Sequence, residues 1–139
     1  MSAAAVEGIL ETALYARDLD AAERFYHDIL GLDIITRAKD RHVFFRCGAG
    51  VLLVFNPDET VKPAAPGALP VPAHGTTGAG HACFRLAREK FDGVITRLTA
   101  AGIAIEADFE WPMGGRSIYF RDPAGNSLEC AEPRIWGIE

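Results

Sequence analysis

Hydrophobic and polar positions along the chain form two similar series of elements. In the first series, the apolar segment at 9–16 predicts a strand, and the segment after it carries apolar residues at helical spacing. Those residues are Ala22, Phe25, Tyr26, Ile29 and Leu30. Gly31 is the expected C-terminal cap of this helix. Three more strands are predicted at 32–36, 43–46 and 51–56, so the first series is βαβββ.

The second series repeats this order. A strand is predicted at 81–86 and a helix at 89–101, which Gly102 ends. The apolar face of that helix consists of Phe91, Val94, Ile95 and Leu98. Strands at 103–107, 117–121 and 126–131 complete a second βαβββ series.

An internal repeat supports this division. A shift of 75 positions lays residues 41–53 over 116–128 with six identities in thirteen positions, Arg46/Arg121 and Leu53/Leu128 among them. We therefore predict an α+β fold in which residues 1–139 form one domain of two βαβββ modules. Module one spans about 8–57 and module two about 80–134, and a proline-rich linker at about 58–79 joins them.

Composition narrows the range of partners. The net charge of −5 argues against nucleic acid and anionic membranes, because both require a basic face. No segment has the pattern of a signal peptide or the length of a membrane span. The three cysteines, Cys47, Cys83 and Cys130, lie in apolar runs and form no Cys-x-x-Cys pair, so we expect buried, reduced thiols in a cytoplasmic protein.

Three residues are candidates for chemistry. Glu129 sits in an apolar run, where a buried carboxylate needs a cation or donors. Glu11 and His81 occupy the same place in the first strand of each module. Together they suggest a three-ligand metal site with open positions, in which Glu11 could alternatively act as a base. A lone strand histidine is more often a hydrogen-bonded core residue.

Strand alternation predicts the residues around Glu129. The neighbouring strand would present Ser117 and Tyr119 on the same face, and the repeat adds His42 and Phe44. Tyr119 could donate to a developing oxyanion as a catalytic residue. Other candidates for substrate binding have simpler alternatives: Arg116 holds a substrate anion or forms a rim ion pair, and Trp111 is a lid or a core anchor.

Three motifs carry a resemblance to a known family. They are Glu-Thr-Ala-Leu-Tyr-Ala-Arg-Asp-Leu-Asp from position 11, Gly-His-Ala-Cys-Phe from position 80, and Tyr-Phe-Arg-Asp-Pro-Ala-Gly-Asn-Ser-Leu-Glu from position 119. With them the chain resembles the vicinal oxygen chelate superfamily, which comprises glyoxalases, bleomycin resistance proteins and dioxygenases. The resemblance implies a half-open mixed β-barrel with flanking helices, a metal inside the cavity, and a homodimer in which modules from two chains can complete each cavity.

The resemblance also implies roles for individual residues. His81 and Glu129 become metal ligands, and Glu11 stands where the family most commonly has histidine. The fourth ligand position falls near 52–54 and is apolar. One imidazole with two carboxylates favours harder ions. Ring-cleaving dioxygenase activity is disfavoured because the usual oxygen-activating iron site has two histidines and one carboxylate, and glyoxalase activity loses support because the fourth ligand is missing.

Two functions from different classes remain. The first is a metal-dependent lyase, isomerase or thiol-transfer enzyme that acts on a small oxygen-rich metabolite or electrophile. It would use one divalent ion: Mn, Zn, Ni, Fe or Mg. The alternative is a metal-free, drug-binding resistance protein that sequesters an aromatic or cationic ligand in the same cavity.

Overall fold

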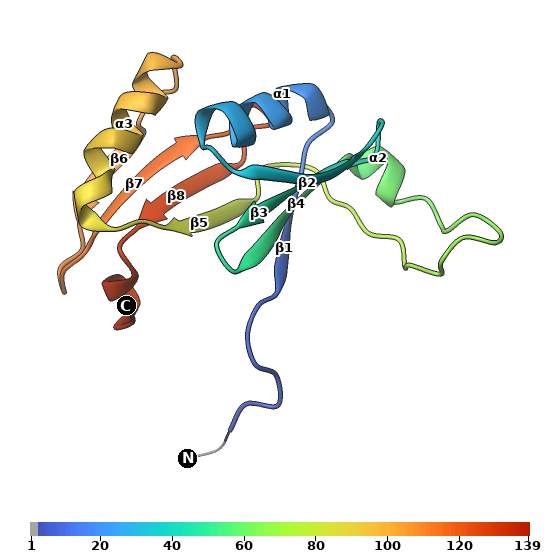
Figure 1. The fold of residues 1–139 in the computed structure, drawn as a ribbon, viewed down its shortest axis with the longest axis horizontal. Coiled ribbons are helices and arrows are strands. Elements are labelled where there is room, and N and C mark those ends of the chain that lie inside the picture. The colour runs from blue at the N-terminus through green and yellow to red at the C-terminus, as the bar shows by residue number, and fades with distance from the viewer. Residues whose placement is uncertain (1–2) are drawn as a thin grey trace.

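The computed structural model describes residues 3–139 and contains two four-stranded sheets with the longest helices on one side (Figure 1). The first half comprises β1 (Glu11–Tyr15), α1 (Leu19–Glu23), the π-helical turn η1 (Arg24–Ile29), β2 (Asp33–Ala38), β3 (His42–Cys47), β4 (Gly50–Phe55) and α2 (Pro57–Thr60). The second half comprises β5 (His81–Arg85), η2 (Arg88–Lys90), α3 (Phe91–Ala100), β6 (Ala107–Glu110), β7 (Arg116–Arg121), β8 (Ser127–Ala131) and η3 (Pro133–Trp136).

Both sheets have the same topology. The strand order is β1-β4-β3-β2 in the first sheet and β5-β8-β7-β6 in the second. In each, the first strand pairs in parallel with the last, and the other pairs are antiparallel. This confirms the predicted α+β fold with two βαβββ units. Neither sheet closes into a barrel, so each leaves one face without a helix.

A single apolar core joins the two halves. Figure 1 shows α1 and α3 on the same side of the molecule, with the sheets beneath them. Phe25 of the first half approaches Phe120 of the second, with ring centroids 6.2 Å apart. Phe91 and Leu98 from α3 belong to the same buried cluster. Because strand residues alternate, successive side chains of each strand point in turn to the side of this core and to the helix-free face.

Local sequence signals account for the helix starts. Asp18 caps α1 because its carboxylate accepts a hydrogen bond from the backbone N–H of Ala21 at 3.0 Å. The linker, predicted to be extended, begins instead with the short helix α2. Asn56 caps it by accepting from the N–H of Asp58, and Pro57 occupies the first turn. This cap signal was present in the sequence.

The strand predicted at 103–107 is wrong in position. β6 begins only at Ala107. The N–H of Ile103 still donates to the carbonyl of Leu98, so the chain is leaving α3 at this point. Ile103 and Ile105 pack against the core from an irregular segment. Their apolar character therefore reflects core packing and not a strand.

The internal repeat holds through β3 and β7 but shifts by one residue after the turn. Arg46 pairs with Val51, whereas its counterpart Arg121 pairs with Ser127. The second turn is therefore one residue longer than the gapless alignment requires. The counterpart of Glu129 in the strand register is therefore Leu53, one of the apolar residues at 52–54.

Candidate active site

Strand register brings three polar side chains together on the helix-free face of the second sheet. Glu129 on β8 lies opposite Tyr119 on β7 and opposite Cys83 on β5. Their neighbours Leu128 and Phe120 point the other way, into the core. Glu129 is nevertheless only 6% exposed, so its carboxylate depends on the groups around it.

His81 presents a free ring nitrogen to this carboxylate. Its Nδ1 lies 2.8 Å from the carbonyl oxygen of Ser127. A carbonyl only accepts, so Nδ1 carries the proton and the neutral ring has its lone pair on Nε2. That Nε2 lies 3.4 Å from Oε1 of Glu129. Two acceptor atoms thus face each other, an arrangement that a proton or a metal cation between them would stabilise.

The second oxygen of Glu129 is held by a short chain of donors. The hydroxyl of Ser117 donates to Oε2 at 2.6 Å, and Nε1 of Trp111 donates to the Ser117 oxygen at 2.8 Å. Trp111 remains 37% exposed and packs edge-on against Phe109. It is therefore not a fully buried anchor. Its indole orients Ser117, which in turn orients the carboxylate.

Tyr119 and Cys83 complete this cluster. Burial, followed by the hydrogen bond to Glu129, raises the pKa of Tyr119 to about 12. Desolvation of the Cys83 sulfur by its neighbours, and then the charge of Glu129, raise the pKa of this thiol to about 12, although the residue as a whole is exposed. Both groups remain protonated near neutral pH, so both act as donors. Tyr119 is thus suited to donate to an oxyanion.

Cys83 was missed as a site residue. All three cysteines were expected to be buried structural thiols, which is right for Cys130 and wrong for Cys83, which is exposed. Strand alternation could have found it, because Cys83 lies two residues from His81 and therefore shares its face.

One chain supplies two of the three predicted metal ligands. His81 and Glu129 fit a divalent ion, because an imidazole lone pair and a carboxylate oxygen face each other. Glu11 lies on β1 of the other sheet. Within residues 3–139 the structure has no group of three His, Cys, Asp or Glu side chains placed to hold a metal. The predicted three-ligand site is therefore not assembled within a single chain.

Glu11 instead lines a separate pocket of about 560 Å³ on the helix-free face of the first sheet. His42 and Phe44, the two residues predicted from the repeat, line the same pocket. Leu53 lies between Phe44 and Ala13 in the sheet register. The first sheet thus has an aromatic pocket where the second sheet has the Glu129 cluster.

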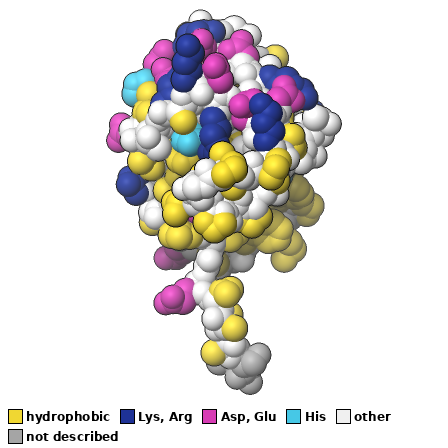
Figure 2. Space-filling model, turned by 90° about the vertical axis from the view of Figure 1, so that its right-hand side faces the viewer, with side chains coloured by type: hydrophobic (Ala, Val, Ile, Leu, Met, Phe, Trp, Pro, Cys, Tyr) yellow, Lys and Arg dark blue, Asp and Glu magenta, His cyan; other side chains and the backbone are white. Residues whose placement is uncertain are grey.

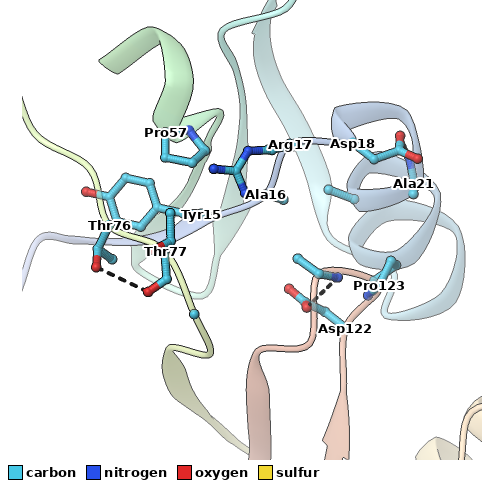
Figure 3. A pocket seen from close by; sticks show the side chains of 13 residues that line it. Tyr15, Ala16, Arg17, Asp18, Ala21, Pro57, Thr76, Thr77, Asp122 and Pro123 are labelled. Atoms are coloured by element: carbon cyan, nitrogen blue, oxygen red, sulfur yellow. Dashed lines mark hydrogen bonds between the residues drawn. The ribbon is translucent and has the colours of Figure 1, made fainter. Parts of the chain in front are cut away.

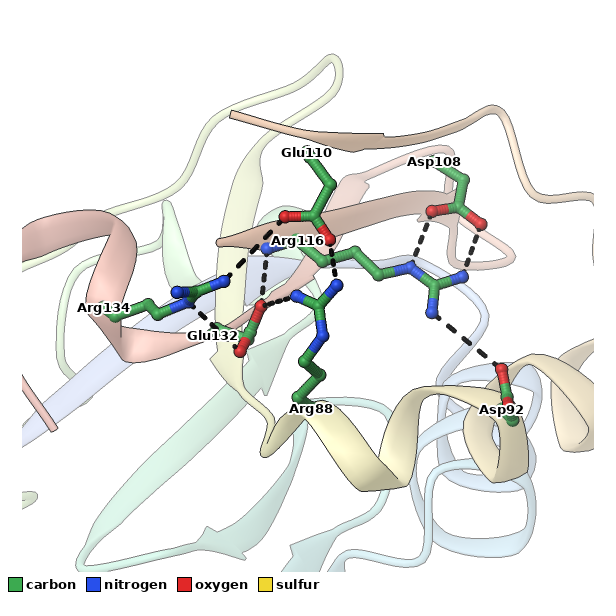
Figure 4. A network of polar contacts seen from close by, with 7 residues as sticks. All are labelled: Arg88, Asp92, Asp108, Glu110, Arg116, Glu132 and Arg134. Carbon is green, nitrogen blue, oxygen red and sulfur yellow. Dashed lines mark hydrogen bonds and ion pairs between the residues drawn. The ribbon is translucent and has the colours of Figure 1, made fainter. Parts of the chain in front are cut away.

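Arg116 lies away from both sites. It is one residue from Ser117 on β7, so it points to the helix-covered face. Its guanidinium binds the carboxylate of Asp108 through two hydrogen bonds of 2.9 and 2.7 Å and lies 5.1 Å above the ring of Phe91 (Figure 4). This placement favours the ion-pair alternative for Arg116, and its substrate-binding role stays a prediction.

A smaller cleft of about 290 Å³ lies where the two halves meet (Figure 3). Tyr15 and Arg17 line it from the first half, Thr76 and Thr77 from the linker, and Asp122 from the second half. None of the predicted catalytic or metal-binding residues lines this cleft.

Comparison with known proteins places the chain in a family. Residues 8–130 match the profile of the Glyoxalase/Bleomycin resistance protein/Dioxygenase superfamily. The chain belongs to this superfamily. No match was found among proteins of curated function. No helix within residues 3–139 has the length and apolar character to cross a membrane.

Solved structures resemble the chain over most of its length. A lactoylglutathione lyase from Agrobacterium tumefaciens is 45% identical, with a TM-score of 0.90 over 96% of this chain and 99% of that one. A virulence protein from Salmonella typhimurium is 26% identical, with a TM-score of 0.67 over 91% and 97%. An integron cassette protein from Halifax Harbour sewage shares the fold at 21% identity, with a TM-score of 0.72 over 91% and 99%.

Proposed function

We propose that the chain is a divalent-metal-dependent enzyme of lyase, isomerase or thiol-transfer type, acting on a small oxygen-rich metabolite or electrophile. The metal would be held by His81 and Glu129 of one chain and by Glu11 of a second copy. The observation that carries this proposal is the pair of facing acceptors, His81 Nε2 and Glu129 Oε1, at 3.4 Å. The fixed tautomer of His81 supports it, because it frees Nε2 for a cation.

The chemistry follows from the donor set. When bound, a divalent ion such as Mn, Zn, Ni, Fe or Mg would act as a Lewis acid toward substrate oxygens. Leu53 stands where the second sheet has Glu129, so at most three protein ligands are available and open positions remain. Tyr119 donates its phenolic proton in a hydrogen bond toward developing negative charge. Ser117 and Trp111 hold the carboxylate in place.

The reaction class draws support from the similar structures. The Agrobacterium protein that is 45% identical is named a lactoylglutathione lyase. A lyase acting on a thiol adduct is therefore the first reaction to assay. The apolar Leu53 argues for testing other metal-chelating electrophiles alongside it, because a fourth protein ligand is lacking at that position.

A homodimer would bring Glu11 to the other two ligands. Each chain presents two incomplete sites on open sheet faces. Figure 2 shows hydrophobic side chains gathered on the lower part of one face, away from the charged side chains near the helices. Val6, Ile9 and Leu10, just before β1, are at least 74% exposed. A two-fold pair of chains would cover such surface and unite the half-sites.

Elemental analysis after loading with a divalent ion tests the metal site. Wild type should retain about one ion per chain, and His81→Ala and Glu129→Ala should lose it. His27→Ala is a matched control, because Nδ1 of His27 also lies 2.8 Å from a carbonyl, that of Leu32, on the exposed helix side. Unchanged metal content in His81→Ala would refute the proposal.

Mixing two inactive variants tests the shared site. Glu11→Ala and His81→Ala should each lose the metal on their own. If each site uses residues of two chains, subunit exchange between them should restore about a quarter of the wild-type sites, because one site of each mixed dimer is intact. No recovery after demonstrated exchange would contradict a site shared between chains.

A second candidate function is a metal-free ligand-binding protein. The aromatic pocket on the first sheet favours it, because its ring lining suits a flat ligand without any metal. In that case ligands should raise the melting temperature equally with and without a chelator. Loss of the stabilisation on chelation would favour the enzyme.

A further inference from the structure

The pocket on the first sheet is built from rows of side chains that cross β3, β4 and β1. Arg46, Val51 and Glu11 form one row at its edge. Phe44, Leu53 and Ala13 form the middle row. His42, Phe55 and Tyr15 form the third row. Because alternate residues share a face, the first and third rows lie about 13 Å apart along β3.

The third row is an aromatic surface. The rings of His42 and Phe44 stack at 3.9 Å, and Phe55 packs edge-on against both. His74 from the linker closes this end, with its ring 4.7 Å from that of Phe55. A hydrogen bond of 2.8 Å between the hydroxyl of Tyr15 and Nδ1 of His74 holds the linker there. The loop histidine is thus a wall of the pocket.

The positive charge at the aromatic end belongs to Arg41, which already contacts the aromatic side chains. The guanidinium of Arg41 lies 5.6 Å above the ring of Phe55, and its Nη1 is 2.7 Å from Nδ1 of His42. Burial and the Arg41 charge lower the pKa of His42, so its ring is neutral and presents a flat face.

The opposite end offers a free cation. Arg46 is exposed, and within residues 3–139 its guanidinium forms no ion pair, although Asp33 on β2 is its cross-strand neighbour. Glu11 belongs to the same row, but Val51 separates the two, which places them about 10 Å apart. Ala13 is small and leaves open space in the middle row. The pocket therefore has a flat aromatic end, an apolar middle and, at the other end, one guanidinium that forms no ion pair within the described residues.

We propose that this pocket binds an elongated anion: an aromatic or flat conjugated group stacks at the His42 and Phe55 end, and a carboxylate at the other end binds Arg46. A guanidinium suits a carboxylate because it can donate two parallel hydrogen bonds. As an assignment of substrate class, this inference rests on the proposed function, since Glu11 lines the same pocket. The binding itself requires no metal.

Calorimetry with three simple probes in the presence of a chelator tests the inference. Phenylhexanoate carries both groups, phenylhexanol lacks the charge and hexanoate lacks the ring. Wild type should bind phenylhexanoate about tenfold more tightly than either of the others. Equal affinity for phenylhexanoate and hexanoate, or no binding of phenylhexanoate, would overturn the inference.

Variants test where the carboxylate and the phenyl ring of the probe bind. Arg46→Met should abolish the preference for phenylhexanoate over phenylhexanol and leave phenylhexanol binding unchanged. Arg24→Met is the control: it also removes one positive charge, but from the exposed side of η1. It should change neither the preference for phenylhexanoate nor the binding of phenylhexanol. Phe44→Leu keeps apolar bulk but loses the ring, so it should weaken both phenyl probes. A preference for the acid that survives in Arg46→Met would refute the role of Arg46.

The outcomes separate this inference from the proposed function. Metal retention that depends on His81, together with no binding of phenylhexanoate, would overturn only the substrate class. Phenylhexanoate binding that depends on Arg46, in a chain that retains no metal after loading, would support the pocket and overturn the metal-dependent enzyme.

Discussion

The hydroxyl of Tyr26 donates a 2.7 Å hydrogen bond to Oδ2 of Asp122, and this contact ties the helix of the first half to the turn of the second. The phenol is fully buried and the carboxylate is 5% exposed. Asn126 extends the contact, because its amide donates to Asp122 and to the carbonyl of Tyr15 and accepts from the N–H of Gly80. The turn at 122–126 is thus a polar joint between the modules.

Removing this hydroxyl should weaken the whole fold. Tyr26→Phe leaves the buried carboxylate of Asp122 with one donor fewer, so the free energy of unfolding should fall by about 1–3 kcal/mol. Urea denaturation measures this change. Tyr119→Phe, at the more open face, should cost clearly less. Equal losses of unfolding free energy in the two variants would mean that the hydrogen bond between Tyr26 and Asp122 stabilises the fold no more than the hydroxyl of Tyr119 does.

Ser117 should control metal affinity without supplying a ligand. Ser117→Ala removes the 2.6 Å hydrogen bond to Glu129 and frees the carboxylate to rotate. We expect the affinity for a divalent ion to fall by about 10- to 100-fold, with one ion still bound at saturation. Competition with a coloured chelator measures the affinity. Unaltered affinity would remove Ser117 from the site.

The variant Trp111→Phe tests the next hydrogen bond, from the indole to Ser117. It removes the donor to Ser117 but leaves the Ser117–Glu129 bond in place. Its effect on metal affinity should therefore be smaller than that of Ser117→Ala. A larger effect would indicate that the indole contacts the bound ion or substrate directly.

Glu132 should make stability depend on acid pH. Burial alone would raise the pKa of this carboxyl, but the N–H of Arg116 and the guanidinium of Arg88, both at 2.8 Å, outweigh it and lower the pKa (Figure 4). The folded state therefore favours the carboxylate. Its contribution is fully present above the unfolded pKa near 4.3 and is lost as the pH falls through the lower folded value.

The variant Glu132→Gln tests this linkage. At neutral pH it should unfold with about 1–3 kcal/mol less free energy than wild type, and the difference should shrink in acid. Glu110→Gln, in the same network but about half exposed, should show a smaller difference. A difference for Glu132→Gln that does not change with pH would point to packing rather than charge.

His42 should titrate below the ordinary range of histidine. Burial is the larger cause and the Arg41 charge the second, so Arg41→Met should raise the pKa of His42 without restoring it fully. The lowered folded pKa means that stability falls as the pH drops from about 6.5 toward the folded value. Proton NMR of the imidazole ring follows the titration, and His42→Gln assigns the signal. An unchanged pKa in Arg41→Met would exclude the contact.

Strand alternation explains which parts of the site the sequence could predict. It correctly put Ser117 and Tyr119 beside Glu129, while their chemical roles stay predictions. The same rule places Arg116 on the opposite face, so spacing alone already favoured the ion-pair alternative for this residue. Alternation also assigns Cys83 to the face of His81.

Features that depend on loop length or long-range contacts were out of reach. The extra residue in the second turn moves the counterpart of Glu129 to Leu53, and no local signal fixes that register. The contact between Tyr26 and Asp122 spans 96 positions of sequence. Glu11 and His81 lie apart because they belong to two separate open sheets. Their equivalent places in the two modules had suggested that they would lie in one site.

The difference between Leu53 and Glu129 has a consequence for how a substrate enters. Two identical walls would accept a molecule equally well in either orientation. Here one wall offers rings and a lone guanidinium, and the other offers an imidazole and a carboxylate. A cavity formed between two such chemically different walls would bind a molecule in one orientation, so it would select molecules whose own two ends differ.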